Sequence, residues 1–267
     1  MYNIRYRRIV VKIGSSSLTH ASGNLDFKKI DRLAMVLSDL KNQGHEIILV
    51  SSGAVAAGRA KLQMQKSTDT MKEKQAAASV GQCELMFLYD KFFSQYGQIV
   101  AQLLLTKTVL TNDSLRENAV NTLSALLEYG VIPIVNENDS VAVDEIAYGD
   151  NDTLSAVTAS IIHADLLILL SDIDGLYDDD PCKNPNANFI EEVTHLDASL
   201  MQLAKDTSSN VGTGGMVTKL QAAKIAMESN MDMIIANGKH PDIVYELLQG
   251  TTRCTRFLGK EQSKWKS

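Results

Sequence analysis

Cysteine is scarce in this sequence, and long apolar runs are missing. The three cysteines, Cys83, Cys182 and Cys254, lie far apart in a chain of 267 residues, and no pair has the spacing of metal ligands. Scattered cysteines in odd number argue against a disulfide framework and fit a reducing compartment. No run approaches the roughly 20 apolar residues of a membrane span, and the N-terminus lacks the apolar core of a secretory signal. We therefore predict a cytoplasmic protein without a membrane partner.

A basic face is missing as well. The formal net charge is −6, and no dense cluster of Lys and Arg is present. Nucleic-acid binders usually carry such a cluster on one face or along one helix. The nearest candidate is RYRR at residues 5–8, which fits a solvated N-terminal arm. We therefore expect no nucleic-acid partner.

Familiar catalytic motifs are also missing. The five histidines are scattered, and neither a Ser-His-Asp order nor a nucleophile elbow is visible, which disfavours acyl-enzyme chemistry. The stretch GTGGMVTKLQAA at 212–223 is rich in glycine but is not a P-loop, because Lys219 follows Thr218 instead of preceding a Ser or Thr. It is not the dinucleotide fingerprint either, since Val217 stands where the third glycine belongs. The stretch by itself could be a phosphate cradle or a flexible turn before a helix.

Short apolar runs are present in number and give the fold class. Their cores are nearly continuous Val, Ile and Leu, which is typical of strands buried on both faces of a parallel sheet. These predicted strands are 8–16, 46–54, 99–106, 131–139, 165–175 and 231–238. Helical patterns lie between them, at 26–44, 112–130, 153–165 and 216–229. Strand–helix alternation over the whole length predicts an α/β fold, a three-layer αβα sandwich with a mainly parallel central sheet, in one domain.

Two of the helical patterns are detailed enough to predict their buried faces. In the first, Gly44 is expected to close the helix, and the apolar stripe is Ile30, Leu33, Leu37 and Leu40. In the second, Asp113 or Ser114 is the expected N-cap and Gly130 the end, and the stripe is Leu115, Ala119, Leu123 and Leu126.

Small and polar residues follow the predicted strands at their carboxyl ends, where ligands bind in open α/β sheets. The segments are KIGSS at 12–16, SSGA at 51–54, NEND at 136–139, GDND at 149–152 and SDIDG at 171–175. Each has two interpretations. Lys12 could face an anion or extend to solvent at the strand end. SSGA could open an anion-binding helix terminus or form a tight turn. The acidic and amide-rich segments could hold an ammonium, a hydroxyl or hydrated Mg²⁺, or only form turns and caps.

Together these groups favour phosphoryl transfer. The sequence offers two lysines in glycine-rich settings, exposed backbone N–H groups and carboxylates, without an obvious covalent nucleophile. Phosphoryl transfer needs this set, because the protein mainly positions the reactants and stabilises charge on the transferring group. A carboxylate between two lysines would hold both in place and keep them protonated.

The motifs also resemble those of a known family. VVKIGSSSL, VSSGAVAAGR, VNENDSVAVDEIAYGDNDTLSA, LLSDIDGLYDDDP and GTGGMVTKLQAA look like the amino acid kinase family over about residues 9–258. The residues in these motifs, and the order of the motifs along the chain, most resemble the members that phosphorylate the γ-carboxylate of glutamate. That reaction is the first step of proline biosynthesis. Ser171 stands where threonine is common, which keeps the hydroxyl.

The resemblance implies roles for individual residues. The expected catalytic residues are Lys12, Lys219 and Asp152, with Asp152 holding the two lysines. The expected glutamate-binding residues are Ser52, Gly53, Ala54, Asn136, Asp139 and Asn151, with Asp139 facing the α-ammonium. The expected nucleotide-binding residues are Lys12, Ser171, Asp172, Thr213, Gly214, Gly215, Met216, Val217, Thr218 and Lys219. No protein ligand is assigned to a metal.

The resemblance also implies ligands and assembly. ATP with Mg²⁺ would be the phosphate donor, proline a feedback inhibitor, and the protein a homo-oligomer, a dimer or tetramer. Many relatives carry a C-terminal PUA domain, for which the tail FLGKEQSKWKS at 257–267 is too short. We therefore expect one kinase domain over 1–267 whose N-terminal part binds glutamate and whose C-terminal part binds ATP. Two alternatives stay open. One is a kinase of the same fold for acetylglutamate, aspartate, carbamate or a nucleotide monophosphate, and the other is a ligand-binding regulatory module without catalysis.

Overall fold

A single large sheet organises the computed structural model, which describes residues 6–20, 22–64, 70–106, 108–141, 151–179, 184, 186–197, 200–201 and 215–259. The strands of this sheet lie in the order β3-β4-β2-β1-β5-β9-β10-β8. They are β1 (Arg8–Ile13), β2 (Glu46–Ser51), β3 (Val100–Leu105), β4 (Ile132–Glu137), β5 (Leu166–Ser171), β8 (Glu192–Val193), β9 (Asp232–Asn237) and β10 (Thr255–Phe257). All neighbouring strands are parallel except β9 and β10. The six predicted strands and the mainly parallel sheet are therefore confirmed.

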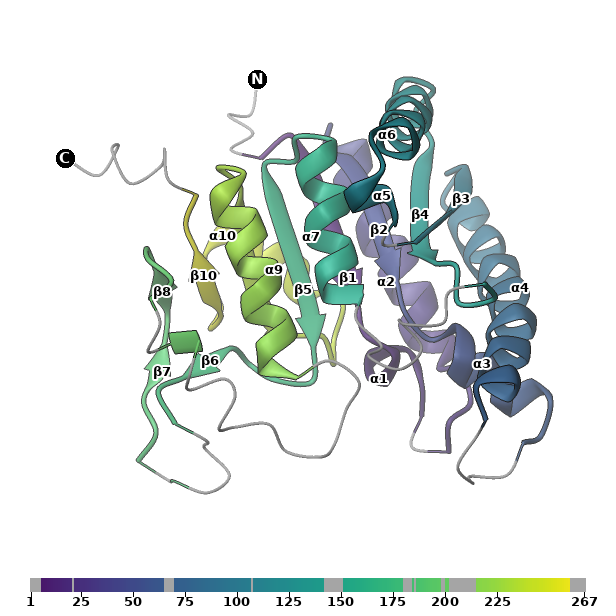
Figure 1. Ribbon diagram of the computed structural model, residues 1–267, viewed down its shortest axis with the longest axis horizontal. Coiled ribbons are helices and arrows are strands. Elements are labelled where there is room, and N and C mark those ends of the chain that lie inside the picture. Colours follow the sequence, from purple (N-terminus) through teal and green to yellow (C-terminus); the bar gives the residue numbers. More distant parts are fainter. Residues whose placement is uncertain are drawn as a thin grey trace.

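Helices cover both faces of this sheet (Figure 1). They are α1 (Ser15–Leu18), α2 (Phe27–Asn42), α3 (Ala54–Lys61), α4 (Met71–Gln95), α5 (Thr108–Thr111), α6 (Asp113–Glu128), α7 (Asn151–Ile161), α9 (Met216–Glu228) and α10 (Ile243–Gln249). The four predicted helices correspond to α2, α6, α7 and α9. A short antiparallel pair, β6 (Leu176–Tyr177) and β7 (Phe189–Ile190), stands outside the main sheet. Within the described residues, no helix has both the length and the apolar surface that crossing a bilayer requires.

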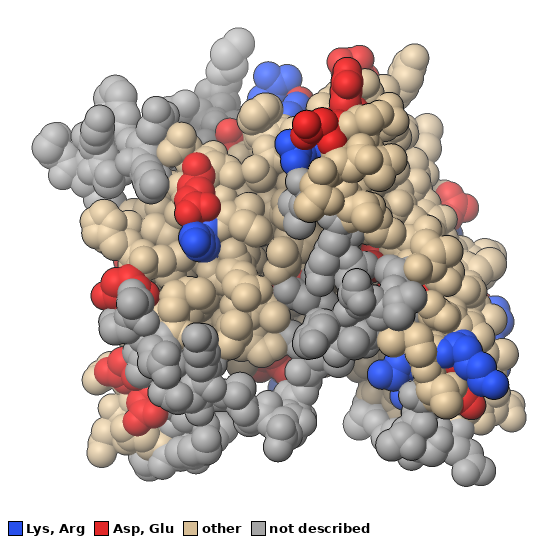
Figure 2. Space-filling model, in the orientation of Figure 1, with Lys and Arg blue, Asp and Glu red and all other residues tan. Residues whose placement is uncertain are grey.

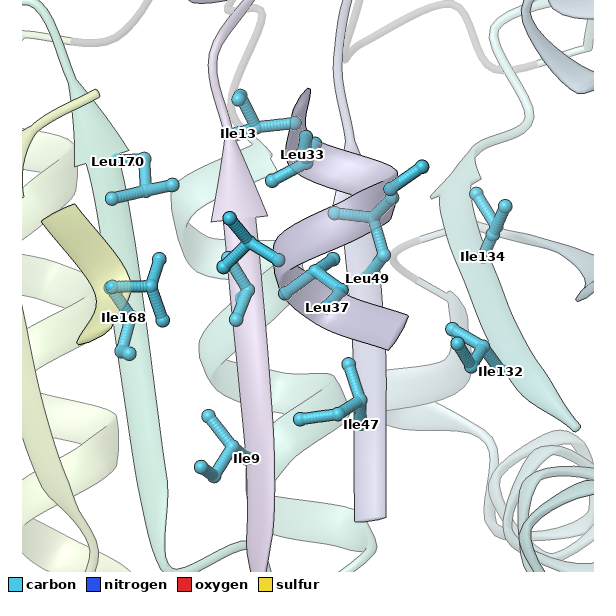
Figure 3. Close-up of a cluster of buried hydrophobic side chains, with 14 of the residues drawn as sticks. Ile9, Ile13, Leu33, Leu37, Ile47, Leu49, Ile132, Ile134, Ile168 and Leu170 are labelled. Atoms are coloured by element: carbon cyan, nitrogen blue, oxygen red, sulfur yellow. The ribbon is translucent and has the colours of Figure 1, made fainter. Parts of the chain in front are cut away.

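Alternate residues of the strands enter two separate cores. Ile9 and Ile13 of β1 point to one face, where they pack with α2, as Figure 3 shows for Leu33 and Leu37. Val10 points to the other face, into the core that α6, α7 and α9 cover. Side chains alternate in this way along any strand, so a strand between two helix layers must be apolar at every position. The three-layer sandwich follows from this pattern.

The first of the two detailed helices ends as the sequence predicts. Asp26 caps α2 by accepting a hydrogen bond from Lys29 N at 3.2 Å, and Gly44 closes its end with φ of 102°, a conformation that glycine adopts without strain. The predicted stripe is fully buried. Its members are Ile30, Leu33, Leu37 and Leu40, each at most 1% exposed.

The second helix differs from the prediction at its start. Asn112 caps α6, and not Asp113 or Ser114: its backbone is still extended, so its side chain can accept a hydrogen bond from Leu115 N. Of the predicted stripe, Ala119 and Leu123 are buried, whereas Leu115 is 43% exposed and Leu126 is half-buried.

Helix α4, which was not predicted from the sequence, packs closely on α3. A Cβ atom at Gly58 would lie 1.7 Å from the Ala77 carbonyl oxygen, and one at Gly81 would lie 1.7 Å from the Ala54 carbonyl oxygen. Any side chain at either glycine would therefore force the two helices apart. The close contact fixes α4 against Ala54, the first residue of α3.

Candidate active site

The carboxyl ends of β1, β2, β4 and β5 meet at one edge of the sheet, because these strands are parallel neighbours. Lys12 of β1 lies between Val50 of β2 and Leu169 of β5 in the strand register. Helix α7 begins at this edge and carries Asn151 and Asp152 in its first turn. The edge therefore joins predicted site residues from distant parts of the sequence.

One buried carboxylate joins the two predicted lysines. Lys12 Nζ lies 2.5 Å from Asp152 Oδ1, and Lys219 Nζ lies 3.1 Å from Asp152 Oδ2. Their exposed fractions are 8% for Lys12, 1% for Asp152 and 4% for Lys219. Lys12 therefore does not extend to solvent, and the structure brings together the three side chains to which catalysis was assigned. We call them the charged triad.

The pKa of Asp152 reflects two opposing effects. Burial alone would raise this pKa, because an ionised carboxyl loses its hydration. The positive charges of Lys12 and Lys219 and their hydrogen bonds outweigh burial and hold the pKa of Asp152 below its ordinary value. Within the triad, two ammonium groups face one carboxylate, so the triad presents net positive charge to an incoming ligand.

The glycine-rich stretch leads directly into the triad. Gly215 is the N-cap of α9 and has open space where a side chain would stand, while Lys219 lies one turn into the helix. Thr218 Oγ1 lies 2.8 Å from Gly215 O and 3.1 Å from Asp152 Oδ2. The contact between Thr218 and Asp152 was not predicted, and it ties the start of α9 to α7. Thr213 and Gly214 lie outside the described residues.

Met216 and Val217 follow Gly215 in the first turn of α9. Both side chains are half-buried and pack against the core between the sheet and α9. Free N–H groups at a helix N-terminus favour anions. The part of the stretch that the structure describes thus suits a phosphate group, with the lysine beside it.

Ser171 and Asp172 lie at the end of β5, beside β1 and β9. Ser171 is buried, and its Oγ donates to Asp172 Oδ1 at 3.1 Å. Its carbonyl oxygen accepts from Gly238 N at 2.7 Å, which joins the ends of β5 and β9. Asp172 is exposed and can meet a ligand from solvent.

On the other side of the triad, neutral groups form a second cluster. Asn151 Nδ2 lies 3.0 Å from the Ser51 carbonyl oxygen, 2.9 Å from Ser52 Oγ and 2.9 Å from Asn136 Oδ1. Asn136 is 2% exposed, and its Nδ2 donates to Gln82 Oε1 of α4 at 2.7 Å. We call Ser52, Asn136, Asn151 and Gln82 the amide network. It joins β2, β4, α7 and α4 at one point.

Gly53 turns the chain from β2 into α3 beside this network. Its φ of 104° lies in the left-handed region, which favours glycine. Ala54 then begins α3, so the predicted helix start after SSGA is confirmed. The backbone of both residues lies next to Ser52, as expected for a pocket wall.

Asp139 is not part of the amide network. Within the described residues, no hydrogen bond joins it to Asn136, Asn151 or Ser52. Asp139 is half-buried, and burial raises its pKa to about 6. A cationic ligand would stabilise the ionised form of such a carboxyl, because its positive charge compensates for the hydration lost on burial.

Gln82 was missed by sequence reasoning, together with Tyr89, whose hydroxyl meets Ser51 Oγ at 2.7 Å. Both lie on α4, whose first half presents mainly alanine and glycine to its neighbours. The sequence signal nearest to Gln82 was Gly81, because a glycine inside a helical segment lowers helix stability and can have a packing reason.

A model of the amino acid kinase family matches residues 7–237. The chain belongs to the amino acid kinase family. It is 48% identical to a glutamate 5-kinase of Clostridium perfringens, with 96% of each chain covered. It is 50% identical to a glutamate 5-kinase of Clostridium acetobutylicum, with 98% of each chain covered.

Two solved structures share the fold at low sequence identity. UMP kinase from Ureaplasma parvum matches with a TM-score of 0.63 and 19% identity, over 94% of this chain and 98% of its own. Carbamate kinase from Giardia lamblia bound to AMP-PNP matches with a TM-score of 0.67 and 15% identity, over 95% and 98%. The predicted fold class is therefore confirmed.

Proposed function

We propose that the protein transfers the γ-phosphoryl group of ATP to the γ-carboxylate of L-glutamate, and so opens proline biosynthesis. The observation that carries this is the charged triad between two different surroundings. On one side lies the N-terminus of α9, which suits phosphates, and on the other lies the neutral amide network. Relatives about half identical to this chain over nearly its full length are named glutamate 5-kinases, which supports glutamate as the acceptor.

The donor side consists of the triad, the start of α9 and the end of β5. Lys12 and Lys219 contact the phosphates and stabilise the charge that develops on the transferring group. Asp152 keeps both ammonium groups in position. The residues from Thr213 to Lys219 bind the phosphates, and Ser171 and Asp172 bind the nucleotide.

The acceptor side consists of the amide network and its neighbours. Ser52, Asn136 and Asn151 bind glutamate by hydrogen bonds, with the backbone of Gly53 and Ala54 as one wall. Asp139 faces the α-ammonium, which suits a half-buried carboxyl near the pocket. Neutral amides suit this side because they can bind carboxylates without competing for the phosphoryl group.

The transfer needs no covalent intermediate with the enzyme. A γ-carboxylate oxygen of glutamate forms a bond to the γ-phosphorus while the bond from that phosphorus to the bridging oxygen of ADP breaks. ADP leaves with the electron pair, and the products are γ-glutamyl phosphate and ADP. No proton moves, since the acceptor carboxylate is already ionised at neutral pH.

Mg²⁺ is proposed only as the companion of the ATP phosphates. Among the residues that the structure describes, no group of three or more His, Cys, Asp or Glu could hold a metal ion. Both oxygens of Asp152 face ammonium groups, so its carboxylate does not suit a metal. Mg²⁺ often reaches such sites on substrate phosphates and keeps several waters.

The remaining expectations stand as parts of the same proposal. The whole chain forms one kinase domain in the cytoplasm, with acceptor residues in its N-terminal part and nucleotide residues in its C-terminal part. Proline acts as feedback inhibitor at or near the acceptor pocket, and the protein assembles as a homo-oligomer. Light scattering and a proline titration of the activity would check the last two statements.

The decisive experiment measures ADP release with a panel of acceptors at saturating MgATP. We expect turnover with L-glutamate, and a γ-glutamyl hydroxamate when hydroxylamine traps the product. The rate of ADP release should not rise above the rate without acceptor when the acceptor is N-acetylglutamate, aspartate, carbamate or UMP. Turnover with one of these and none with glutamate would overturn the proposal, and no turnover with any acceptor would favour a regulatory module.

A further inference from the structure

Helix α4 makes one contact with the end of β4 and one with the turn that follows it. Gln82 Oε1 accepts from Asn136 Nδ2 at 2.7 Å, and Ser79 Oγ lies 2.8 Å from Ser140 Oγ. The two α4 residues are three positions apart, so they lie on one face of the helix. This face therefore holds both ends of the segment that carries Asn136 and Asp139.

Three contacts together fix which way the Asn136 amide points, and Gln82 supplies the one on its NH₂ side. Asn136 Oδ1 lies 2.8 Å from Glu137 N and 2.9 Å from Asn151 Nδ2, and both of these groups are donors. Asn136 Nδ2 must then find an acceptor on its other side, and Gln82 Oε1 is that acceptor. The reversed amide would place its NH₂ group against two donors and its oxygen against Gln82 Oε1, so it would lose all three hydrogen bonds.

The orientation of Asn136 in turn fixes Asn151. Its Nδ2 is shared among the oxygens of Asn136, Ser52 and Ser51. If Asn136 presented NH₂ instead of oxygen, Asn151 would lose one of these partners and turn away from Ser52. Gln82 thus acts on the pocket through a chain of two amides.

The position of Gln82 is itself fixed by its neighbour in the chain. Gly81 lies against the Ala54 carbonyl oxygen with no room for a side chain. Ala54 begins α3 and forms part of the proposed pocket wall. One turn of α4 therefore sets the distance between this wall and the amide network.

We propose that Gln82 is a positioning residue for the acceptor: it holds the Asn136 amide in the orientation that lets Asn136 and Asn151 bind glutamate. This rests on the proposed function, because it assigns the amide network to the acceptor. It adds a residue from α4, a helix that carries none of the residues assigned to the donor side.

The test replaces Gln82 by methionine, which has similar length and lacks the amide. Losing a single hydrogen bond of this kind should raise the KM for glutamate about tenfold. The KM for ATP should stay near the value of the unsubstituted protein. The matched control is Gln95→Met, the same change at an exposed position of the same helix, which should leave both constants unchanged.

A double-mutant cycle separates positioning from a general packing defect. If Gln82 acts through Asn136, Gln82→Met should add less than about twofold to the glutamate KM once Asn136→Ala is present. Equal effects in both backgrounds, or a rise in the KM for ATP as large as that for glutamate, would overturn the proposal.

Should Gln82→Met fail to fold, Ser79→Ala breaks the second contact at the surface. It should then raise the glutamate KM alone, and an unchanged glutamate KM would count against the proposal. Failure of the proposed function would be distinct, since the unsubstituted protein would then show no turnover with glutamate.

Discussion

The charged triad and the amide network are neighbours at one sheet edge, yet they are built on opposite principles. The triad buries three ionised side chains and satisfies them with one another. The network uses neutral groups, in which each amide must point the right way to serve as donor or acceptor. On the exposed face drawn in Figure 2, by contrast, Lys, Arg, Asp and Glu lie scattered among uncharged residues.

The difference suggests a division of labour. Charge matters most where phosphoryl groups gather negative charge in the transition state, so the triad should control turnover. Orientation matters most where a small acid is bound before the chemistry, so the network should control acceptor affinity. Substitutions in the two clusters should therefore change different kinetic constants.

The strongest test of the charged triad is the substitution Asp152→Asn. This change keeps the shape but leaves two buried ammonium groups side by side. We expect kcat to fall by about 10³ and the free energy of unfolding to fall by about 3–5 kcal/mol. Urea unfolding beside steady-state kinetics would check both, and a stable variant with normal turnover would contradict the role of the carboxylate.

The next effect in size is that of Lys219→Ala. We expect kcat to fall by a factor on the order of 10² or more, because one source of positive charge at the transferring group is gone. Lys224→Ala is the matched control, since Lys224 lies on the same helix α9 and its side chain is 61% exposed. If Lys219→Ala kept a kcat close to normal at saturating substrates, the role of Lys219 in turnover would be contradicted.

For the acceptor half, Asp139→Ala should act on binding. Losing a carboxylate that faces the α-ammonium should raise the KM for glutamate about tenfold or more, with little change in the KM for ATP. Initial rates with each substrate varied in turn would measure both. A higher KM for ATP with an unchanged KM for glutamate would contradict the assignment of Asp139 to the acceptor side.

The smallest expected effect is a pH dependence. Burial raises the pKa of Asp139 to about 6, so its carboxylate is present above that pH and is lost as the pH falls through it. The value of kcat/KM for glutamate, which reports on the free enzyme, should decline below about pH 6. Asp139→Asn should remove this inflection, and an identical profile in that variant would assign the inflection to another group.

The sequence carried enough information for the sheet and for the triad. Strands buried on both faces read as continuous apolar runs, and the lysines stand in glycine-rich settings that few other roles would require. Ile30, Leu33, Leu37 and Leu40 form a stripe that any helix in contact with the sheet must bury. These features depend on local sequence pattern, and they could be predicted.

The amide network could not be predicted in the same way. Its members come from β4, α4, α7 and the residue after β2, and their hydrogen bonds depend on distances that no spacing in the sequence encodes. The clearest miss is α4, because its buried face begins with Ala77, Ala78 and Gly81, which do not stand out as an apolar stripe. The close approach of α3 and α4 at Gly58 and Gly81 became visible only in the structure.

The most direct measurement of the division between the two clusters is glutamate binding to Lys219→Ala by titration calorimetry in the presence of a non-hydrolysable ATP analogue. We predict a Kd for glutamate within about twofold of that of the unsubstituted protein, although turnover is lost. A Kd weakened as strongly as turnover would show that the triad binds the acceptor, and it would contradict the separation of charge and orientation at this site.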